Sequence, residues 1–179
     1  NTLMIFTSDN GAAKRFDGIH NSSGVMQGKK RSLNEGGIRV PMVVRWPDKI
    51  KAGRVSSHPW YFPDVMPTFA EIGGVSTEVP EDIDGISILP TLLDKGVQKQ
   101  HEYMFWQYGV RAVRSGKWKG IGKGGHLYLY DLSEDIEEKN DLSSKHPEIS
   151  ARMKKYITIG YREPRSQKDD GKYTGKDKK

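Results

Sequence analysis

Short apolar runs separated by long polar stretches mark the first half of the chain. Residues 2–7 form a nearly continuous run of strand-forming side chains, and residues 38–46 form a second. Apolar runs that do not alternate are typical of strands buried on both faces, usually in a parallel sheet with helices on either side. A strand of this kind needs neighbours, so we expect further strands to precede Asn1 in a longer protein. Pro41 predicts that the second strand begins irregularly or at an edge.

Two short helices are predicted between the second strand and the middle of the chain. The first starts at Pro63 and Asp64, continues through two turns of apolar positions, and ends at Gly73-Gly74. The second is predicted over residues 88–93, as one or two helical turns.

From about residue 98 the pattern changes to short strand-like runs broken by turn residues. Ser115-Gly116 and the glycines of residues 122–125 are hairpin signals. After Pro147, apolar side chains recur at helical spacing. We therefore predict a small antiparallel sheet packed by one C-terminal helix. The expected strands are 103–108, 110–114, 118–121 and 127–132, and the apolar face of the helix is Ile149, Met153, Tyr156 and Ile157.

The last residues of the chain form a basic tail. The formal net charge is +6, and residues 162–179 hold seven Lys or Arg against four Asp or Glu with almost no apolar side chain. Such a segment cannot bury enough surface to order itself, so we expect it to be flexible. Its charge is interpreted first as a solvated terminal run, with attraction to a sulfated glycan or nucleic acid as the alternative. The predicted segments are therefore 1–97, 98–161 and 162–179.

No cysteine occurs in the chain, which excludes a disulfide, a thiolate metal site and a cysteine nucleophile within these residues. No stretch approaches the length of a membrane span, and no signal peptide is visible. The five histidines show no spacing typical of a metal motif. His20 is kept as a candidate substrate contact because it lies in the polar loop 9–33, whose length favours a functional role.

Asp9 and Asn10 directly follow the first apolar run, where ligands collect at the carboxyl ends of strands in open α/β sheets. Carboxylate and amide oxygens are hard ligands suited to calcium or magnesium. Calcium takes about six to eight oxygens, so these two side chains would need further ligands from elsewhere. The alternative is that Asp9-Asn10-Gly11 is only a turn that ends the strand.

Lys30 is the candidate electrostatic catalyst, because a lysine on a glycine-flanked loop near a metal can stabilise an anionic group such as sulfate. A solvated loop charge within Lys29-Lys30-Arg31 is the alternative. Glu35 is expected to hold the following turn by accepting backbone hydrogen bonds, and Arg39 is expected to pair with a carboxylate.

These segments together resemble the signatures of type I, formylglycine-dependent sulfatases. Thr7-Ser8-Asp9-Asn10-Gly11 is similar to a strand end whose Asp and Asn bind calcium, and residues 30–41 match a Lys-x-Ser/Thr-x-x-Glu-Gly-Gly-x-Arg-x-Pro signature whose lysine contacts the sulfate. The resemblance implies calcium ligands at Asp9 and Asn10 and a catalytic, sulfate-binding role for Lys30. It continues in order through residues 64–68, 84–90, 111–119, 129–132 and 138–142.

The implied fold is α/β: the C-terminal part of an alkaline-phosphatase-like mixed sheet sandwiched by helices, followed by the small antiparallel sheet with its helix. Asn34 and Ile136 depart from the family pattern without touching the implied chemistry. The nucleophile, a formylglycine made in a Cys/Ser-x-Pro-x-Arg motif, has no counterpart in the chain. It would lie upstream, together with the other metal ligands.

By this resemblance the intact protein would hydrolyse a sulfate ester, on a sulfated carbohydrate, with calcium, and would be periplasmic or secreted, or lysosomal in a eukaryote. The missing N-terminal part is its expected partner; nucleic acid and a membrane span are not expected. These residues alone are expected to be inactive. Two other functions stay open: a phosphomonoester or phosphonate hydrolase of the same superfamily, and a truncated, non-catalytic glycan-binding module.

Overall fold

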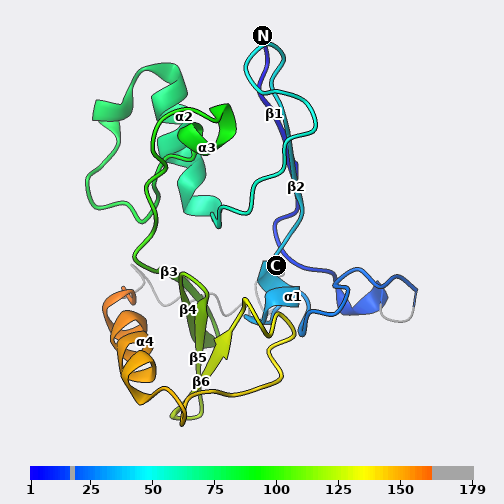
Figure 1. The fold of residues 1–179 in the computed structure, drawn as a ribbon, viewed down its shortest axis with the longest axis vertical. Helices are drawn as coiled ribbons and strands as arrows, with labels where there is room; N and C mark the ends of the chain where they lie inside the picture. The colour runs from blue at the N-terminus through cyan, green and yellow to red at the C-terminus, as the bar shows by residue number, and fades with distance from the viewer. Residues whose placement is uncertain (17–18, 163–179) are drawn as a thin grey trace, which may run out of the picture. The chain divides into compact units, whose positions relative to one another are not determined.

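The computed structural model describes residues 1–16 and 19–162. The chain divides into two compact units, whose helices and strands are labelled in Figure 1. The first unit contains Asn1–Thr7 and Met42–Met104, and the second contains Ser8–Pro41 and Phe105–Lys179. The units are therefore interleaved along the chain, whereas the predicted segments are consecutive. The predicted boundaries stay a prediction, and the predicted tail lies outside the described residues except for Arg162.

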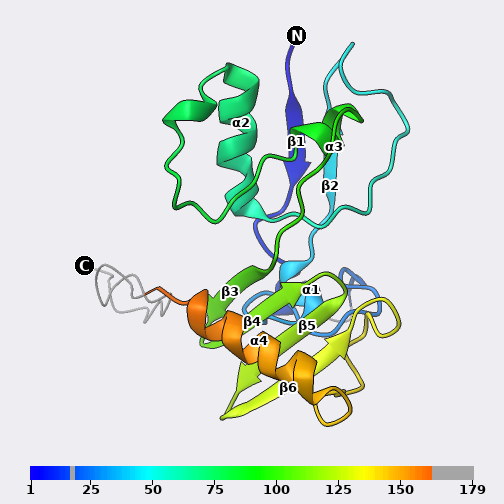
Figure 2. The ribbon, with the colours of Figure 1, turned by 60° about the vertical axis from the view of Figure 1, so that its left-hand side comes forward.

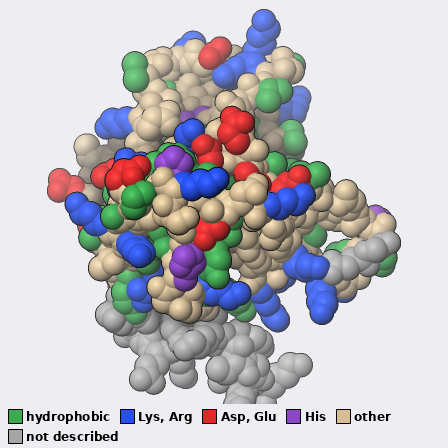
Figure 3. All heavy atoms as spheres, turned by 60° about the horizontal axis from the view of Figure 1, so that its bottom comes forward, with side chains coloured by type: hydrophobic (Ala, Val, Ile, Leu, Met, Phe, Trp, Pro, Cys, Tyr) green, Lys and Arg blue, Asp and Glu red, His purple; other side chains and the backbone are tan. Residues whose placement is uncertain are grey.

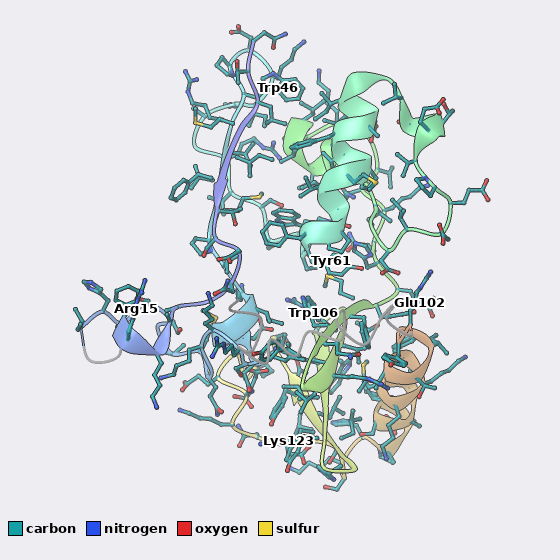
Figure 4. The ribbon with its side chains drawn as sticks, turned by 180° about the vertical axis from the view of Figure 1, so that it is seen from behind. Arg15, Trp46, Tyr61, Glu102, Trp106 and Lys123 are labelled. Carbon is teal, nitrogen blue, oxygen red and sulfur yellow. The ribbon has the colours of Figure 1, made fainter. Side chains whose placement is uncertain are left out.

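The first unit contains a two-stranded antiparallel sheet of β1 (Met4–Thr7) and β2 (Met42–Arg45), which run side by side in Figure 1. Met4 and Phe6 are 58% and 71% exposed. In the described residues β1 pairs with β2 alone and neither face is fully covered, so burial of the first strand by strands preceding Asn1 stays a prediction. Indole Nε1 of Trp46, labelled in Figure 4, donates a 3.0 Å hydrogen bond to Asn1 Oδ1.

The predicted second strand is shorter than residues 38–46. Ile38 instead ends a helical turn, α1 (Glu35–Ile38), and the strand starts only after Pro41. Proline lacks the backbone N–H that a sheet ladder needs, which explains why the strand begins at the next residue.

Both predicted helices of the first unit are confirmed. A short 3₁₀ turn, η2 (Phe62–Asp64), leads into α2 (Val65–Gly73), and Gly74 ends the helix with a left-handed φ of 74°. After a second 3₁₀ turn, η3 (Ser76–Glu78), the helix α3 (Leu89–Leu93) forms where it was expected.

Asp64 is the organising side chain of this unit and is fully buried. Its Oδ1 accepts the backbone N–H of Ile86 at 2.8 Å and lies 2.8 Å from His101 Nε2. Its Oδ2 accepts the backbone N–H of Tyr61 at 3.0 Å, and its carbonyl accepts the hydroxyl of Thr68 at 2.6 Å. The carboxylate therefore ties the start of α2 to the loop before α3.

Replacing Asp64 by alanine is expected to destabilise the protein by about 3 kcal/mol or more, since it removes a fully buried carboxylate and leaves two partly buried backbone N–H groups and a partly buried imidazole without their acceptor. Denaturant unfolding measures the change. Glu71→Ala is the control, because Glu71 is an exposed residue of the same helix. Equal stability of the two variants would contradict the organising role of Asp64.

The second unit contains a four-stranded sheet in the order β3-β4-β5-β6, with β4–β5 and β5–β6 antiparallel. The predicted strands and hairpins are confirmed. Gly124 and Gly125, with φ of 59° and 80°, close the last hairpin in a conformation that requires glycine. The strands are β3 (Met104–Tyr108), β4 (Val110–Ser115), β5 (Trp118–Lys123) and β6 (His126–Asp131).

The helix α4 (Pro147–Ile159) lies across one face of this sheet, as predicted (Figure 2). Two residues of this helix, Met153 and Tyr156, are buried. The approach is close at Gly120, where an added Cβ would lie 2.9 Å from Met153 Cβ. Glycine at this position of β5 therefore lets the helix backbone approach the sheet.

The segment Ser8–Pro41, which contains the 3₁₀ turn η1 (Lys14–Phe16) and α1, packs against the opposite face of the sheet through Leu33 and α1. Leu33 from this segment is buried in one cluster with Ala112, Ile121, Tyr130 and Leu132. Partly buried Trp106, labelled on β3 in Figure 4, packs against the same cluster. The loop that contains Lys30 is thus anchored in the core of the C-terminal sheet.

Among the described residues, no helix combines the length and the apolar character needed to cross a membrane. On the face shown in Figure 3, Lys and Arg side chains are interspersed with Asp and Glu. Mixed signs on this face give no particular support for an electrostatic nucleic-acid surface there. The absence of a nucleic-acid partner stays a prediction.

Candidate functional site

Asp9 and Asn10 lie in a tight turn just beyond the end of β1. The hydroxyl of Ser8 donates to the carbonyl of Asn10 at 2.8 Å and closes the turn. Asp9 is exposed and Asn10 is half-buried. Because the strand has ended, the two neighbouring side chains are not held to opposite faces of a sheet. Both side chains could therefore turn toward one ligand.

Two backbone hydrogen bonds bring Lys30 to this turn. The N–H of Gly11 donates to the carbonyl of Gly37 at 2.9 Å, and the N–H of Lys30 donates to the carbonyl of Ala12 at 2.9 Å. The lysine therefore stands opposite the residues that directly follow Asn10, although about twenty positions separate them in sequence. Its side chain is exposed. The structure thus brings together three of the four predicted site residues.

Glycines make this contact between segments possible. An added Cβ at Gly11 would lie 1.9 Å from the carbonyl oxygen of Gly36, and one at Gly37 would lie 2.1 Å from that of Ser32. At Gly36, a Cβ would lie 2.5 Å from the carbonyl oxygen of Gly28. No side chain fits at these distances, so the backbones of the turn and of the Lys30 loop are in direct contact.

The residues present fit a hard cation in part. The carboxylate of Asp9 and the amide oxygen of Asn10 are suitable ligands for calcium, and magnesium takes similar donors. The part of the chain that the structure describes contains no group of three or more His, Cys, Asp or Glu that could hold a metal. Two ligands are fewer than the roughly six that calcium needs, so Asp9 and Asn10 would form only part of a site.

His20 lines a cavity of about 520 Å³ that borders the Lys30 loop. Ala12, whose carbonyl accepts the Lys30 N–H, and Lys29 also line it, together with Phe16, Asn21, Ser22 and Ser23, among others. Asp9, Asn10 and Lys30 are not among the residues that line this cavity. The His20 ring centroid is 6.3 Å from that of Phe16. Its role as a substrate contact stays a prediction; the cavity that it lines is shared with Ala12 and Lys29 of the Lys30 site.

Glu35 has a different role from the predicted one. Its Oε1 accepts a 2.8 Å hydrogen bond from Lys119 Nζ, and its Oε2 lies 3.5 Å from Arg39 Nη1. It was expected to accept backbone hydrogen bonds within its turn, but the fully buried ammonium of Lys119 is the stronger partner. The backbone N–H of Glu35 donates to Glu138 Oε2 at 2.7 Å. The expected pairing of Arg39 with a carboxylate is confirmed.

Glu35, Lys119 and Glu138 form a buried ion cluster. Lys119 Nζ is 2.8 Å from Glu35 Oε1 and 2.9 Å from Glu138 Oε1, and the Lys119 side chain is 0% exposed. Burial raises the pKa of Glu35, but the neighbouring Lys119 ammonium, with Arg114 and Arg39, lowers it by more, so the net pKa lies below its usual value. Glu35 is therefore ionised at neutral pH.

Neither Lys119 nor Glu138 was identified from the sequence as part of this cluster. Lys119 lies inside a predicted strand next to other charged residues, and Glu138 lies in an acidic stretch. Nothing in such local patterns distinguishes a buried charge from a solvated one. The signal available was their place within segments that match the family signature.

The strand-end Asp-Asn turn, the adjacent loop lysine, and the antiparallel sheet covered by one helix form the arrangement that the sequence resemblance to sulfatases leads one to expect. A family model described as N-sulphoglucosamine sulphohydrolase, C-terminal, matches residues 28–160. The chain belongs to this sulfatase family.

Curated relatives agree with this assignment. The chain is 40% identical over 133 residues to mouse steryl-sulfatase, covering 67% of the chain and 21% of that protein. It is 34% identical over 180 residues to the N-acetylgalactosamine-6-O-sulfatase of Bacteroides thetaiotaomicron, covering 83% of the chain and 34% of the relative. The chain thus spans only about a fifth to a third of the length of these two relatives.

A solved structure from a Bacteroides thetaiotaomicron locus for the metabolism of multiple glycosaminoglycans superposes with a TM-score of 0.73 and 30% identity. The similarity covers 89% of this chain and 38% of that one. The predicted family and the predicted α/β fold class are both confirmed, and the chain corresponds to the C-terminal portion of an alkaline-phosphatase-like sulfatase fold.

Proposed function

We propose that this chain supplies part of the active site of a sulfuric ester hydrolase. The observation that carries the proposal is the pair of backbone hydrogen bonds that places Lys30 opposite the Asp9-Asn10 turn. A cation at that turn and the Lys30 ammonium could then act on the same sulfate group.

Each residue has a distinct role in this proposal. Asp9 and Asn10 are ligands of a calcium ion, with magnesium as the alternative, and other parts of the intact protein complete the ligand set. A bound divalent cation supplies charge stabilisation for sulfate oxygens. Lys30 is an exposed donor that stabilises negative charge developing on the oxygen of the departing alcohol.

The nucleophile would be a formylglycine outside these residues. The chain contains no cysteine, and none of its prolines is followed two positions later by arginine. We therefore expect the 179 residues in isolation to show no turnover of sulfate esters. Turnover by the isolated chain would show that the nucleophile lies within it and would contradict this assignment.

A sulfated carbohydrate is the proposed substrate class. The Bacteroides relative is named for the sulfate of a sugar, and the similar solved structure comes from a glycosaminoglycan locus. A periplasmic or secreted location, or a lysosomal one in a eukaryote, belongs to the same proposal.

The test is to express the protein from its complete gene in a host that makes formylglycine, and to measure release of sulfate and of phosphate from matched sugar monoesters. We expect sulfate release to dominate and to fall when calcium is removed by a chelator. Preferential phosphate release would instead assign a phosphomonoester hydrolase. Binding of sulfated oligosaccharide without turnover and without calcium dependence would favour a non-catalytic module.

Replacing Asp9 by asparagine tests, in the same assay, whether the Asp9 carboxylate is a metal ligand. The change keeps the size of the side chain and removes its charge, so we expect the calcium concentration for half-maximal activity to rise by about tenfold or more. Asp48→Asn is the matched control, because Asp48 is an exposed aspartate of the other compact unit. An unchanged calcium requirement in Asp9→Asn would remove Asp9 from the metal site.

A further inference from the structure

The buried ion cluster connects the sheet of the second unit to the loop that contains Lys30. Its three charged groups come from distant places in the chain: Glu35 from α1, Lys119 from β5, and Glu138 from the turn region after β6. All three are buried, with exposures of 2%, 0% and 2%. Charges are seldom buried without a partner, because the cost of removing them from water must be offset by close opposite charges.

The cluster fixes the backbone of α1 as well as the side chain of Glu35. Glu138 Oε2 accepts the first N–H of the helical turn, at Glu35, and the Glu138 carbonyl accepts Nε2 of Gln27 at 3.2 Å. Glu138 itself has a φ of 53°, an uncommon conformation for a residue with a side chain. The segments before and after Lys30 are therefore both attached to Glu138.

From α1 a short series of backbone hydrogen bonds leads to the site. The N–H of Gly36 donates to the carbonyl of Gln27 at 2.7 Å, and the carbonyl of Gly37 accepts the N–H of Gly11 at 2.9 Å. The backbone N–H of Lys30 in turn donates to the carbonyl of Ala12. Because the glycine contacts leave no room for adjustment, a displacement of Glu35 would move the Lys30 backbone relative to the Asp9-Asn10 turn.

We propose that Lys119 is a positioning residue for Lys30: it holds Glu35 and Glu138 together, and through them fixes the loop that presents Lys30 to the departing oxygen of the substrate. Lys119 is fully buried and does not touch the substrate itself. The inference rests on the proposed sulfatase function for its effect on catalysis. The structural coupling of Lys119 to the Lys30 loop does not depend on that function.

The catalytic arm of the test uses the protein expressed from its complete gene. Lys119→Met removes the ammonium and keeps an unbranched stem, and Glu138→Gln is a milder change that keeps an acceptor for the Glu35 N–H. We expect kcat/KM for a sugar sulfate to fall by about tenfold to a hundredfold in Lys119→Met, and by less in Glu138→Gln. Nitrophenyl sulfate should be affected less, because its good leaving group needs less help from Lys30.

A double-mutant cycle with Lys30→Ala identifies the route of the effect. If Lys119 acts through Lys30, adding Lys119→Met to Lys30→Ala should cost little further activity. Met153→Ala is the control, because Met153 is fully buried on the opposite, α4-covered face of the same sheet. It should lower the midpoint of thermal unfolding without changing the ratio of activities on the two substrates. Additive losses, or the same change of ratio in Met153→Ala, would overturn the proposal.

Hydrogen exchange on the same variants tests the coupling without any assay of activity. In Glu138→Gln and Lys119→Met the amides of Gly11 and Lys30 should exchange faster, while the amides of α2 in the other unit should not change. Unchanged protection of Gly11 and Lys30 would overturn the proposal even in an active enzyme. Faster exchange in a protein without sulfatase activity would support the positioning role and refute the proposed function.

Discussion

Lys30→Ala is expected to lower kcat/KM for a sugar sulfate by about 100- to 1000-fold, the usual effect of removing one preorganised donor of charge stabilisation. Lys30 is exposed, and its backbone N–H donates to the carbonyl of Ala12, a hydrogen bond that alanine preserves. The loss should therefore appear without a change in the unfolding transition. Steady-state kinetics on a sugar sulfate, together with denaturant unfolding, measures both.

Lys51→Ala is the matched control, since it removes the same charge from an exposed position of the other compact unit. It should leave kcat/KM within about twofold at moderate salt, because salt screens an exposed charge that makes no contact with the substrate. If the two variants lose activity equally, Lys30 acts only through net charge. In that case the interpretation of Lys29-Lys30-Arg31 as a solvated run of charges would be correct.

Gly37→Ala is expected to produce the largest change in stability, about 3 kcal/mol or more. Its Cβ would lie 2.1 Å from the carbonyl oxygen of Ser32 and 2.6 Å from that of Lys29. Both are backbone atoms, so the contact cannot be relieved by rotation of a side chain. The residues from Lys29 to Ser32 would have to move away from Gly37 and would displace Lys30, so activity should fall together with stability.

Gly73→Ala is the control for this prediction. Gly73 is the last residue of α2, and an added Cβ there would meet only Val75 Cγ2 at 3.7 Å, an ordinary contact. Alanine has the better helix propensity, so this variant should be neutral or more stable by up to about 1 kcal/mol. Denaturant unfolding of both variants decides the matter: similar destabilisation would mean that the close approach at Gly37 is not specific.

The second half of the fold was predictable because its signals are local. The turn at Gly124-Gly125 has a backbone conformation that favours glycine. The spacing of Met153, Tyr156 and their neighbours gives the helix a single apolar face. The first strand was less predictable. An apolar run such as residues 4–7 does not reveal whether partners that could cover both faces are present.

For the site, the sequence by itself determined the kinds of donor that Asp9, Asn10 and Lys30 offer and the family signature to which they belong. Only the tertiary structure showed that Lys30 stands opposite the Asp9-Asn10 turn, that His20 lines a cavity bordering the Lys30 loop, and that Glu35 is paired with Lys119. The reason is physical: side-chain type and turn propensity are properties of neighbouring residues. In contrast, a buried ion pair depends on which distant segments the core brings together, here across 84 positions of the chain.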